Sequence, residues 1–257
     1  MVRGGSGLDE RYNYAIEAHS LGKSFNGTAA VRNIDLKVDY GELFAFLGPN
    51  GSGKSTTIKM LIGLLKPDSG SVKMFGMDFE RHALELKERF SFIPDTPHTL
   101  GKLTGDEYLN FIASIFKMDQ DYYLSKRDEL LQLFDLEGKT GQLIEGYSHG
   151  MKQKIVLVAS LMHDPDIIFL DEPTVGLDPL STRNLKNYLR MQCDQGKTVF
   201  LTTHILEIAE QMADRIAIVY NGSIKVEGNL SELQEMSHLP DATLEDVFLE
   251  LTKGVSI

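Results

Sequence analysis

Residues 43–56 read LFAFLGPNGSGKST, and this stretch decides the fold. Its first part, residues 43–47, is a continuous apolar run of the kind that forms a buried parallel strand. Residues 48–55 satisfy the pattern G-x-x-x-x-G-K-[ST], in which the backbone N–H groups of a glycine-rich loop surround phosphate oxygens. Apolar residues then recur at helical spacing over residues 58–65. Because the loop stands between a strand and a helix, the sequence predicts a nucleotide-binding site.

Each type of residue in this phosphate-binding loop has a predicted role in binding phosphate or Mg²⁺. Glycines let the N–H groups turn inward with no Cβ atom in the way. Lys54 supplies a cation for the β- and γ-phosphates, and Ser55 offers its hydroxyl group to Mg²⁺. The helix that starts at Gly53 directs its positive N-terminal end toward the same anion. The predicted nucleotide-binding residues of the loop are Gly48, Pro49, Asn50, Gly51, Ser52, Gly53, Lys54, Ser55 and Thr56.

Two acids and a histidine follow other predicted strands. The apolar run at residues 167–170 ends in Asp171 and Glu172. An aspartate at this place holds Mg²⁺, usually through water, and the adjacent glutamate would act as a general base on the attacking water. His204 ends a strand predicted at residues 199–203. Because parallel strands deliver their carboxyl ends to one edge of a sheet, we expect His204 near Asp171, where it would bind the γ-phosphate and the water.

Alternation of short apolar runs with amphipathic patterns favours the α/β class with a largely parallel sheet. Thr104 and Glu107 form a capping box that opens a predicted helix, and a second helix is predicted over residues 123–134. Strand patterns are missing between about residues 100 and 162, which predicts a helical insertion. The apolar stripe of the first helix consists of Tyr108, Phe111, Ile112 and Ile115.

The C-terminal part of the chain carries a hairpin signal and a last helix. A strand predicted at residues 216–220 is followed by Asn-Gly at 221–222, which is typical of a tight turn, and by apolar alternation over 224–226. Thr243 is the predicted cap of the last helix. The apolar face of that helix consists of Leu244, Val247, Phe248 and Leu251. We therefore expect one α/β core, one helical lobe and a small C-terminal appendage.

Composition excludes several classes of protein. The formal net charge is −11, from 26 basic and 37 acidic residues, whereas domains that bind nucleic acid usually run basic. The lone Cys193 cannot form an internal disulfide, which favours a reducing, cytosolic compartment. No apolar run approaches the roughly 18–20 residues that cross a bilayer. The glycine-rich start, residues 1–7, has no apolar stretch of the kind found in signal peptides.

With these residues assembled, the chain resembles the nucleotide-binding subunit of ATP-binding cassette (ABC) transporters over about residues 14–230. Residues 147–154 read YSHGMKQK, which is similar to the family's signature L-S-G-G-Q and its basic helix start. This signature precedes the acidic strand end by 171 − 148 = 23 residues, as the family's order requires. Three further matches are the D-loop at 175–178 with Asp178, the H-loop at 203–204, and Phe25 as the aromatic residue that stacks on adenine.

The resemblance implies a fold and a domain organisation. The fold is a P-loop NTPase core with a RecA-like, mostly parallel sheet, an N-terminal antiparallel β subdomain and a helical subdomain inserted at about residues 96–162. A flexible tail is expected at residues 1–12, the ABC ATPase domain at 13–230 and a C-terminal helical extension at 231–257. ATP and Mg²⁺ are the implied cofactors.

The family's mechanism implies two partners. Two such subunits, copies or homologues, pair head to tail, so that each ATP lies between the phosphate-binding loop of one and the signature of the other. The signature residues concerned are Ser148, His149, Gly150 and Met151. An integral membrane subunit, docked on the helical lobe and residues 92–109, would convert closure of this dimer into transport. The chain would then sit on the cytoplasmic side of the membrane as a peripheral subunit.

Three positions depart from the family's pattern. His149 stands in place of the first glycine of the signature, and Tyr147 stands in place of its leucine. Asp95 follows Ile-Pro at residues 93–94, where the Q-loop normally has glutamine. Asp95 would either bind Mg²⁺ through a bridging water or stay withdrawn until the membrane subunit docks, and we favour the second. The ending at residues 244–252 resembles branches that work with export-type membrane subunits, although a plain packing helix explains these residues equally well.

Two other functions compete with a transporter subunit. An ABC-type ATPase that acts on ribosomes or DNA would carry two cassettes or a long coiled coil, and this sequence has one cassette, no heptad run and a net charge of −11. A regulatory module that binds nucleotide without turnover is disfavoured by the presence of both Glu172 and His204.

Overall fold

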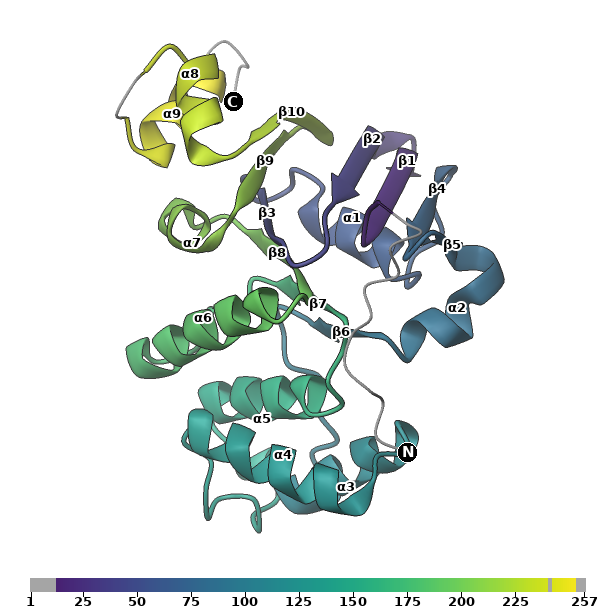
Figure 1. The fold of residues 1–257 in the computed structure, drawn as a ribbon, viewed down its shortest axis with the longest axis vertical. Coiled ribbons are helices and arrows are strands. Elements are labelled where there is room, and N and C mark those ends of the chain that lie inside the picture. Colours follow the sequence, from purple (N-terminus) through teal and green to yellow (C-terminus); the bar gives the residue numbers. More distant parts are fainter. Residues whose placement is uncertain (1–12, 240–241, 253–257) are drawn as a thin grey trace. The chain divides into compact units, whose positions relative to one another are not determined.

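The computed structural model describes residues 13–239 and 242–252 of the chain, which forms two compact units (Figure 1). The first unit comprises the described residues up to Lys87 and from Arg190 onward, and the second runs from Glu88 to Leu189. The predicted tail at residues 1–12 and the end of the predicted extension, 253–257, lie outside the described residues. The predicted domain limits stay predictions. None of the helices in the described part of the chain is long and apolar enough to span a membrane.

An antiparallel sheet forms one half of the first unit. Its strand order is β2-β1-β4-β5, with β1 at Ile16–Phe25, β2 at Thr28–Val38, β4 at Ser69–Met74 and β5 at Met77–Asp78. The strands β1 and β2 are joined by Asn26 and Gly27, whose φ angles of 49° and 80° suit a tight hairpin turn. The antiparallel β subdomain implied by the family resemblance is thus confirmed.

The other half of the first unit is a mixed sheet. Strand β3 (Leu43–Leu47) pairs in parallel with β8 (Thr198–Thr203) on one side and with β9 (Arg215–Tyr220) on the other. Every residue of β3 and β8 is buried, as the apolar run predicts. Strand β10 (Ser223–Gly228) pairs antiparallel with β9, and the Asn-Gly pair between them has φ angles of 51° and 78°. The predicted strands and the predicted hairpin are confirmed.

Helices pack on both sheets of the first unit. Helix α2 (Phe79–Lys87) contacts β4 and β5 of the antiparallel sheet. The helices that contact the mixed sheet are α1 (Lys54–Leu61), α7 (Leu206–Met212), α8 (Leu230–Met236) and α9 (Leu244–Thr252). Sequence analysis identified α1 and α9 but not α2, α7 or α8. Helix α6 (Pro179–Asp194) contains the boundary between the two units of the chain.

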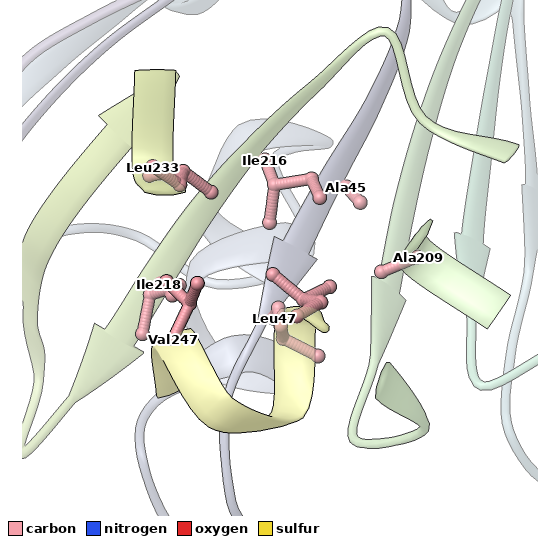
Figure 2. Packing of buried hydrophobic residues seen from close by; sticks show 8 residues of the cluster. Ala45, Leu47, Ala209, Ile216, Ile218, Leu233 and Val247 are labelled. Carbon is pink, nitrogen blue, oxygen red and sulfur yellow. The ribbon is translucent and has the colours of Figure 1, made fainter. Parts of the chain in front are cut away.

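The C-terminal helix α9 is a packing helix. Thr243 caps it as predicted, since its Oγ1 accepts a hydrogen bond from the N–H of Asp246 over 3.3 Å. Leu244 and Val247 are fully buried in a cluster with Leu47 of β3 and Ile218 of β9, and Figure 2 shows Val247 beside these strands. Phe248 packs against the same cluster. The predicted apolar face is therefore confirmed for Leu244, Val247 and Phe248, while the side chain of Leu251 lies outside the described part of the structure. The extension therefore covers the strand that leads into the phosphate-binding loop.

The second unit combines two strands with the helical lobe. Strands β6 (Phe90–Ile93) and β7 (Ile167–Asp171) pair in parallel. Both α3 and α4 contact α5, so these helices form one lobe (Figure 1). The lobe contains α3 (Gly105–Ile115), α4 (Gln120–Leu133), a 3-10 turn at Ile144–Gly146 and α5 (His149–Leu161). The predicted helical insertion is confirmed.

The structure corrects the predicted face of α3. The capping box of Thr104 and Glu107 is present, and Tyr108 of the predicted stripe is buried. Phe111 and Ile115 are instead 47% and 55% exposed, so this part of the stripe was wrong. The reason is the close approach of Gly105 to the segment before α5: a Cβ atom on Gly105 would lie 2.5 Å from the Tyr147 hydroxyl. That contact turns Leu109 and Ala113 inward.

The second predicted helix begins earlier than expected. Helix α4 starts at Gln120 rather than at residue 123, because Asp119 is its N-cap and accepts hydrogen bonds from the N–H groups of Asp121 and Tyr122. It ends at Leu133, one residue before the predicted end.

Candidate nucleotide-binding site

The phosphate-binding loop is held by close backbone contacts that require glycine. Gly53 has a φ angle of 102°, and a Cβ atom there would lie 2.6 Å from the carbonyl oxygen of Ala30. A Cβ atom on Gly48 would lie 2.2 Å from the carbonyl oxygen of Val219. The N–H group of Gly222 donates to the carbonyl oxygen of Ser52 over 3.0 Å. The loop is therefore braced by β2 and by the β9–β10 turn, which sequence analysis predicted as a hairpin but did not connect with the loop.

Lys54 is buried at the start of α1, with 6% of its surface exposed. Its ammonium group donates to the carbonyl oxygens of Gly48 over 2.7 Å and of Pro49 over 3.2 Å. The cation is thus held over the glycine-rich loop, where the sequence predicts phosphate oxygens. Ser55 and Thr56 follow in the first turn of α1, and both are half-buried.

The remaining positions of the loop divide into inner and outer residues. Ser52 is buried, whereas Asn50 and Gly51 are exposed. Gly51 has a φ angle of 80° and open space around it. An exposed loop tip on a buried base leaves the outer face of the loop accessible to a ligand.

Phe25 lies in the first unit at the tip of the β1–β2 hairpin. Its side chain is 47% exposed, and the Lys23 ammonium group lies 5.8 Å from the centroid of its ring. Asp68 fixes this end of β1, because it accepts hydrogen bonds from the Lys23 ammonium group and from the N–H of Ser24. An exposed ring on an anchored strand end suits stacking on a nucleobase, the task that the resemblance implies for Phe25.

His204 follows β8 at the same sheet edge as the phosphate-binding loop. Thr203 is in register with Leu47, and the N–H of Gly48 donates to the carbonyl oxygen of Thr203 over 3.2 Å. His204 is exposed there. Its predicted proximity to Asp171, which belongs to the second unit, stays a prediction.

The acidic pair occupies the carboxyl end of β7. Asp171 is its last residue and is 1% exposed, and Glu172 follows with a left-handed φ of 49°. Ile93 is in register with Leu170, so Asp95 and Glu172 each lie two residues beyond the last strand pair, at one sheet edge. Asp95 is exposed, and its Oδ1 accepts a hydrogen bond from the N–H of Thr96 over 2.8 Å.

The signature segment forms the start of α5. Ser148 is the N-cap, and its Oγ accepts a hydrogen bond from the N–H of Met151 over 3.2 Å. His149 is exposed and Gly150 is half-buried, so the N-terminal end of α5 is accessible to an anion. Tyr147, which departs from the family's leucine, is buried and donates its hydroxyl hydrogen to the carbonyl oxygen of Lys139 over 2.9 Å.

The D-loop is tied to the signature helix by an ion pair that sequence analysis missed. Asp178 lies 2.7 Å from the ammonium group of Lys154 on α5, and it also accepts hydrogen bonds from the N–H and hydroxyl groups of Ser181. The hydrogen bond from Lys154 is the main cause that lowers the pKa of Asp178. Lys154 is buried, and a buried charge requires a partner, so this ion pair follows from the fold rather than from a local sequence pattern.

Comparisons with known proteins identify the family of the chain. A family model described as ABC transporter matches residues 31–175. The probable multidrug ABC transporter ATP-binding protein YbhF of Escherichia coli K12 is 36% identical over 239 residues, which are 92% of this chain and 41% of YbhF. This chain thus spans less than half of YbhF. The ABC-type transporter ATP-binding protein EcsA of Bacillus subtilis 168 is 32% identical over 238 residues, 93% of this chain and 96% of EcsA.

Two solved structures share the fold. An ATP-binding subunit of an ABC transporter superimposes with a TM-score of 0.89 at 33% identity and covers 93% of this chain and 100% of its own. The dimeric structure of MJ0796, a bacterial ABC transporter cassette, gives a TM-score of 0.76 at 25% identity, with coverage of 84% and 98%. The chain therefore belongs to the ABC transporter family, in which it is a nucleotide-binding domain.

Proposed function

We propose that this chain binds ATP with Mg²⁺, hydrolyses the ATP, and thereby drives transport through a separate integral membrane subunit. The observation that carries the proposal is the glycine cradle of residues 48–53, which holds the buried ammonium group of Lys54 against its own carbonyl oxygens. A buried cation beside a loop of N–H groups is built for phosphate oxygens rather than for a neutral ligand.

Binding uses both ends of the nucleotide. Lys54 exchanges its two carbonyl partners for oxygens of the β- and γ-phosphates, and the N–H groups of residues 48–56 surround the same anion. The ring of Phe25 stacks on the adenine, since it is exposed and held by an anchored strand. The phosphates supply most of the affinity, and Phe25 adds a preference for a flat base.

Magnesium fits the oxygen atoms that the chain offers. The hydroxyl of Ser55 and the carboxylate of Asp171 are hard oxygen donors, which Mg²⁺ prefers, and Asp171 acts through water. Among the described residues no group of three or more His, Cys, Asp and Glu side chains could hold a metal ion, so phosphate and water would provide the other ligands. When bound, the ion neutralises charge that develops on the phosphates.

Hydrolysis needs a base and a group that orients the water. Glu172 accepts a proton from water as the water attacks the γ-phosphorus in line with the leaving ADP oxygen. His204 donates a hydrogen bond to the γ-phosphate and holds the attacking water. Strand register supports both roles, because it places Glu172 at the carboxyl end of β7 and His204 at that of β8.

Two further subunits complete the transporter. A second copy, or a homologous subunit, presents the N-terminal end of α5, residues 148–151, to the γ-phosphate, and the MJ0796 cassette is itself a dimer. The membrane subunit docks on the helical lobe and residues 92–109, where Phe111 and Ile115 of α3 offer exposed apolar surface. The chain then lies on the cytoplasmic side of the membrane as a peripheral subunit. The name of YbhF supports an export-type transporter.

Asp95 relays contact with the membrane subunit. Its exposed carboxylate is engaged with the neighbouring N–H of Thr96 rather than with the acidic strand end. An additional negative charge beside the γ-phosphate would repel it, by an amount that falls with distance and screening by water. Asp95 therefore approaches the nucleotide only when the membrane subunit docks.

Two substitutions test the proposal in the isolated chain. Glu172→Gln should retain ATP binding and lose hydrolysis, so that an ATP-bound dimer accumulates in size-exclusion chromatography with ATP and Mg²⁺. Lys54→Ala should abolish ATP binding in a titration calorimeter, because it removes the desolvated cation. Lys59→Ala, one turn further along α1, is the matched control and should bind as the wild type does. Hydrolysis by Glu172→Gln at the wild-type rate contradicts the assignment of the base.

A further inference from the structure

His149, the residue that departs from the signature pattern, is in contact with the D-loop. A Cβ atom at Gly176 would lie 2.5 Å from Cδ2 and 2.8 Å from Nε2 of the His149 ring. Gly150 approaches the same place, since a Cβ atom on it would lie 2.9 Å from the carbonyl oxygen of Gly176. The imidazole ring thus occupies the space that any side chain at position 176 would need.

Gly176 belongs to the turns that connect Glu172 to α6. The N–H of Val175 donates to the carbonyl oxygen of Glu172 over 3.2 Å, and the N–H of Leu177 donates to that of Thr174 over 3.2 Å. Both Glu172 and Gly176 have left-handed φ angles, 49° and 85°. A ring packed closely against Gly176 limits the movement of these two turns.

The far end of these turns is also fixed to α5. Asp178 follows Gly176 by two residues and forms the ion pair with Lys154. The segment from Glu172 to Asp178 is therefore held against α5 at two points, one electrostatic and one steric. The contact of the imidazole ring with Gly176 exists because His149 replaces glycine and because Gly176 leaves room for the ring.

We infer that His149 is a positioning residue for catalysis: its ring packs against Gly176 and holds the turns that orient Glu172. This inference rests on the proposed role of Glu172 as the base. It makes positions 149 and 176 a coupled pair, so that a side chain at 176 is more harmful while the histidine is present than after its removal.

A double-mutant cycle tests the pair in the full-length chain. His149→Ala retains Cβ but removes the ring atoms near position 176, and it should lower kcat while turnover stays measurable. Gly176→Ala should lower kcat by a factor about fivefold larger in the wild type than in the His149→Ala background, a coupling of the size seen between contacting residues. The KM for ATP should change less than about twofold, because neither change alters the phosphate-binding loop.

Gly138→Ala is the matched control. Gly138 lies in the same unit with a φ of 69° and open space around it, so the control adds the same backbone strain without the steric clash. Its effect on kcat should be equal in both backgrounds. Equal losses from Gly176→Ala in both backgrounds would overturn the inference, as would complete inactivity of His149→Ala.

A second readout separates this inference from the proposed function. The wild type and the three variants of the cycle are compared by their urea unfolding midpoints, where Gly176→Ala should again lower the midpoint less in the His149→Ala background. If Lys54→Ala hydrolyses ATP as the wild type does, the proposed site is wrong. Additive unfolding midpoints overturn the contact between His149 and Gly176 whatever the activity.

Discussion

Glu42, directly before the strand that leads to the phosphate-binding loop, is a buried carboxyl group. Its Oε2 accepts a hydrogen bond from the N–H of Asp39 over 2.7 Å, and its Oε1 lies 3.2 Å from Nε of Arg215. Burial raises the pKa of Glu42 to about 7, and Arg215 offsets only part of this effect. Because the folded state binds this proton more tightly than the unfolded chain does, Glu42 stabilises the fold at low pH and less as the pH rises through about 7.

Glu42→Gln should remove this dependence on pH. The amide does not titrate, it keeps the size of the side chain, and its oxygen still accepts from Asp39. Arg215 retains Glu227 and Asp39 as ionic partners. Between pH 5 and pH 8 the urea midpoint of the wild type should fall by the equivalent of about 2 kcal/mol, whereas that of the variant should fall much less.

The control for Glu42→Gln is Glu80→Gln, a change of the same kind at a carboxylate whose side chain is 74% exposed. It should leave the pH dependence as it is in the wild type. A steep loss of stability above pH 7 in Glu42→Gln would contradict the assignment of the titration to Glu42.

At the residue level, local chemistry was predictable and long-range contact was not. The pattern of residues 48–56 predicted the loop, and the structure adds that Gly48 and Gly53 are needed because β9 and β2 pass within contact of them. His149 appeared in the sequence only as a departure from glycine. Its partner Gly176 lies 27 residues away (176 − 149), and no periodic pattern links the two.

At the scale of elements, the sequence predicted those whose signals are local. Apolar runs were sufficient to predict strands β3, β7, β8 and β9, and a capping box was sufficient to predict the start of α3. Helix α2 escaped prediction because His82 interrupts it with non-helical angles, and α7 has only 7 residues and no side-chain cap. Helix α8 does carry a signal, the capping box of Asn229 and Glu232, which sequence analysis overlooked.

The C-terminal helix α9 makes a prediction of its own. Val247 is fully buried against β3 and β9 (Figure 2). Val247→Ala removes two buried methyl groups and should lower the free energy of unfolding by about 2 kcal/mol. The melting temperature should fall by roughly 4–8 °C for a chain of this size, as measured by differential scanning fluorimetry.

Leu249→Ala on the same helix provides the comparison, since Leu249 is 53% exposed. Its effect should stay within about 0.5 kcal/mol, as is usual for surface positions. Equal melting temperatures for the two variants would mean that α9 does not stay packed on the sheet in solution. Because the cluster includes Leu47, loosening of α9 should also weaken ATP binding.

At the scale of the whole molecule, the phosphate-binding loop and the signature lie in different units of the chain, residues 48–56 in the first and 148–151 in the second. A nucleotide held between two copies needs the loop from one and the signature from the other. One copy can therefore carry a substitution in the loop and the other copy a substitution in the signature. A mixture of the two copies should then form one intact composite site.

Lys54→Ala removes the cation of the loop but leaves the signature intact, while Ser148→Arg leaves the loop intact and places a bulky cation at the N-cap of α5. Neither variant alone should associate in the presence of ATP, because every composite site contains one damaged half. An equal mixture should associate, since the loop of the Ser148→Arg copy meets the intact signature of the Lys54→Ala copy. Energy transfer between fluorophores on the two variants reports the association. Introducing Glu172→Gln into both copies prevents hydrolysis from dissolving the dimer.

Two controls make the complementation decisive. Ser125→Arg, an exposed position on α4, adds the same charge away from the signature and should associate alone as well as the unaltered chain does. Ser148→Arg should also bind ATP as a monomer with nearly unchanged affinity, because its own loop is intact. Suppose that both controls behave as stated and that energy transfer in the mixture is no greater than in either variant alone. This result would show that the signature does not serve the nucleotide of a second copy. Loss of monomer binding in Ser148→Arg would instead place the signature in the chain's own nucleotide site, and the head-to-tail arrangement would then have to be abandoned.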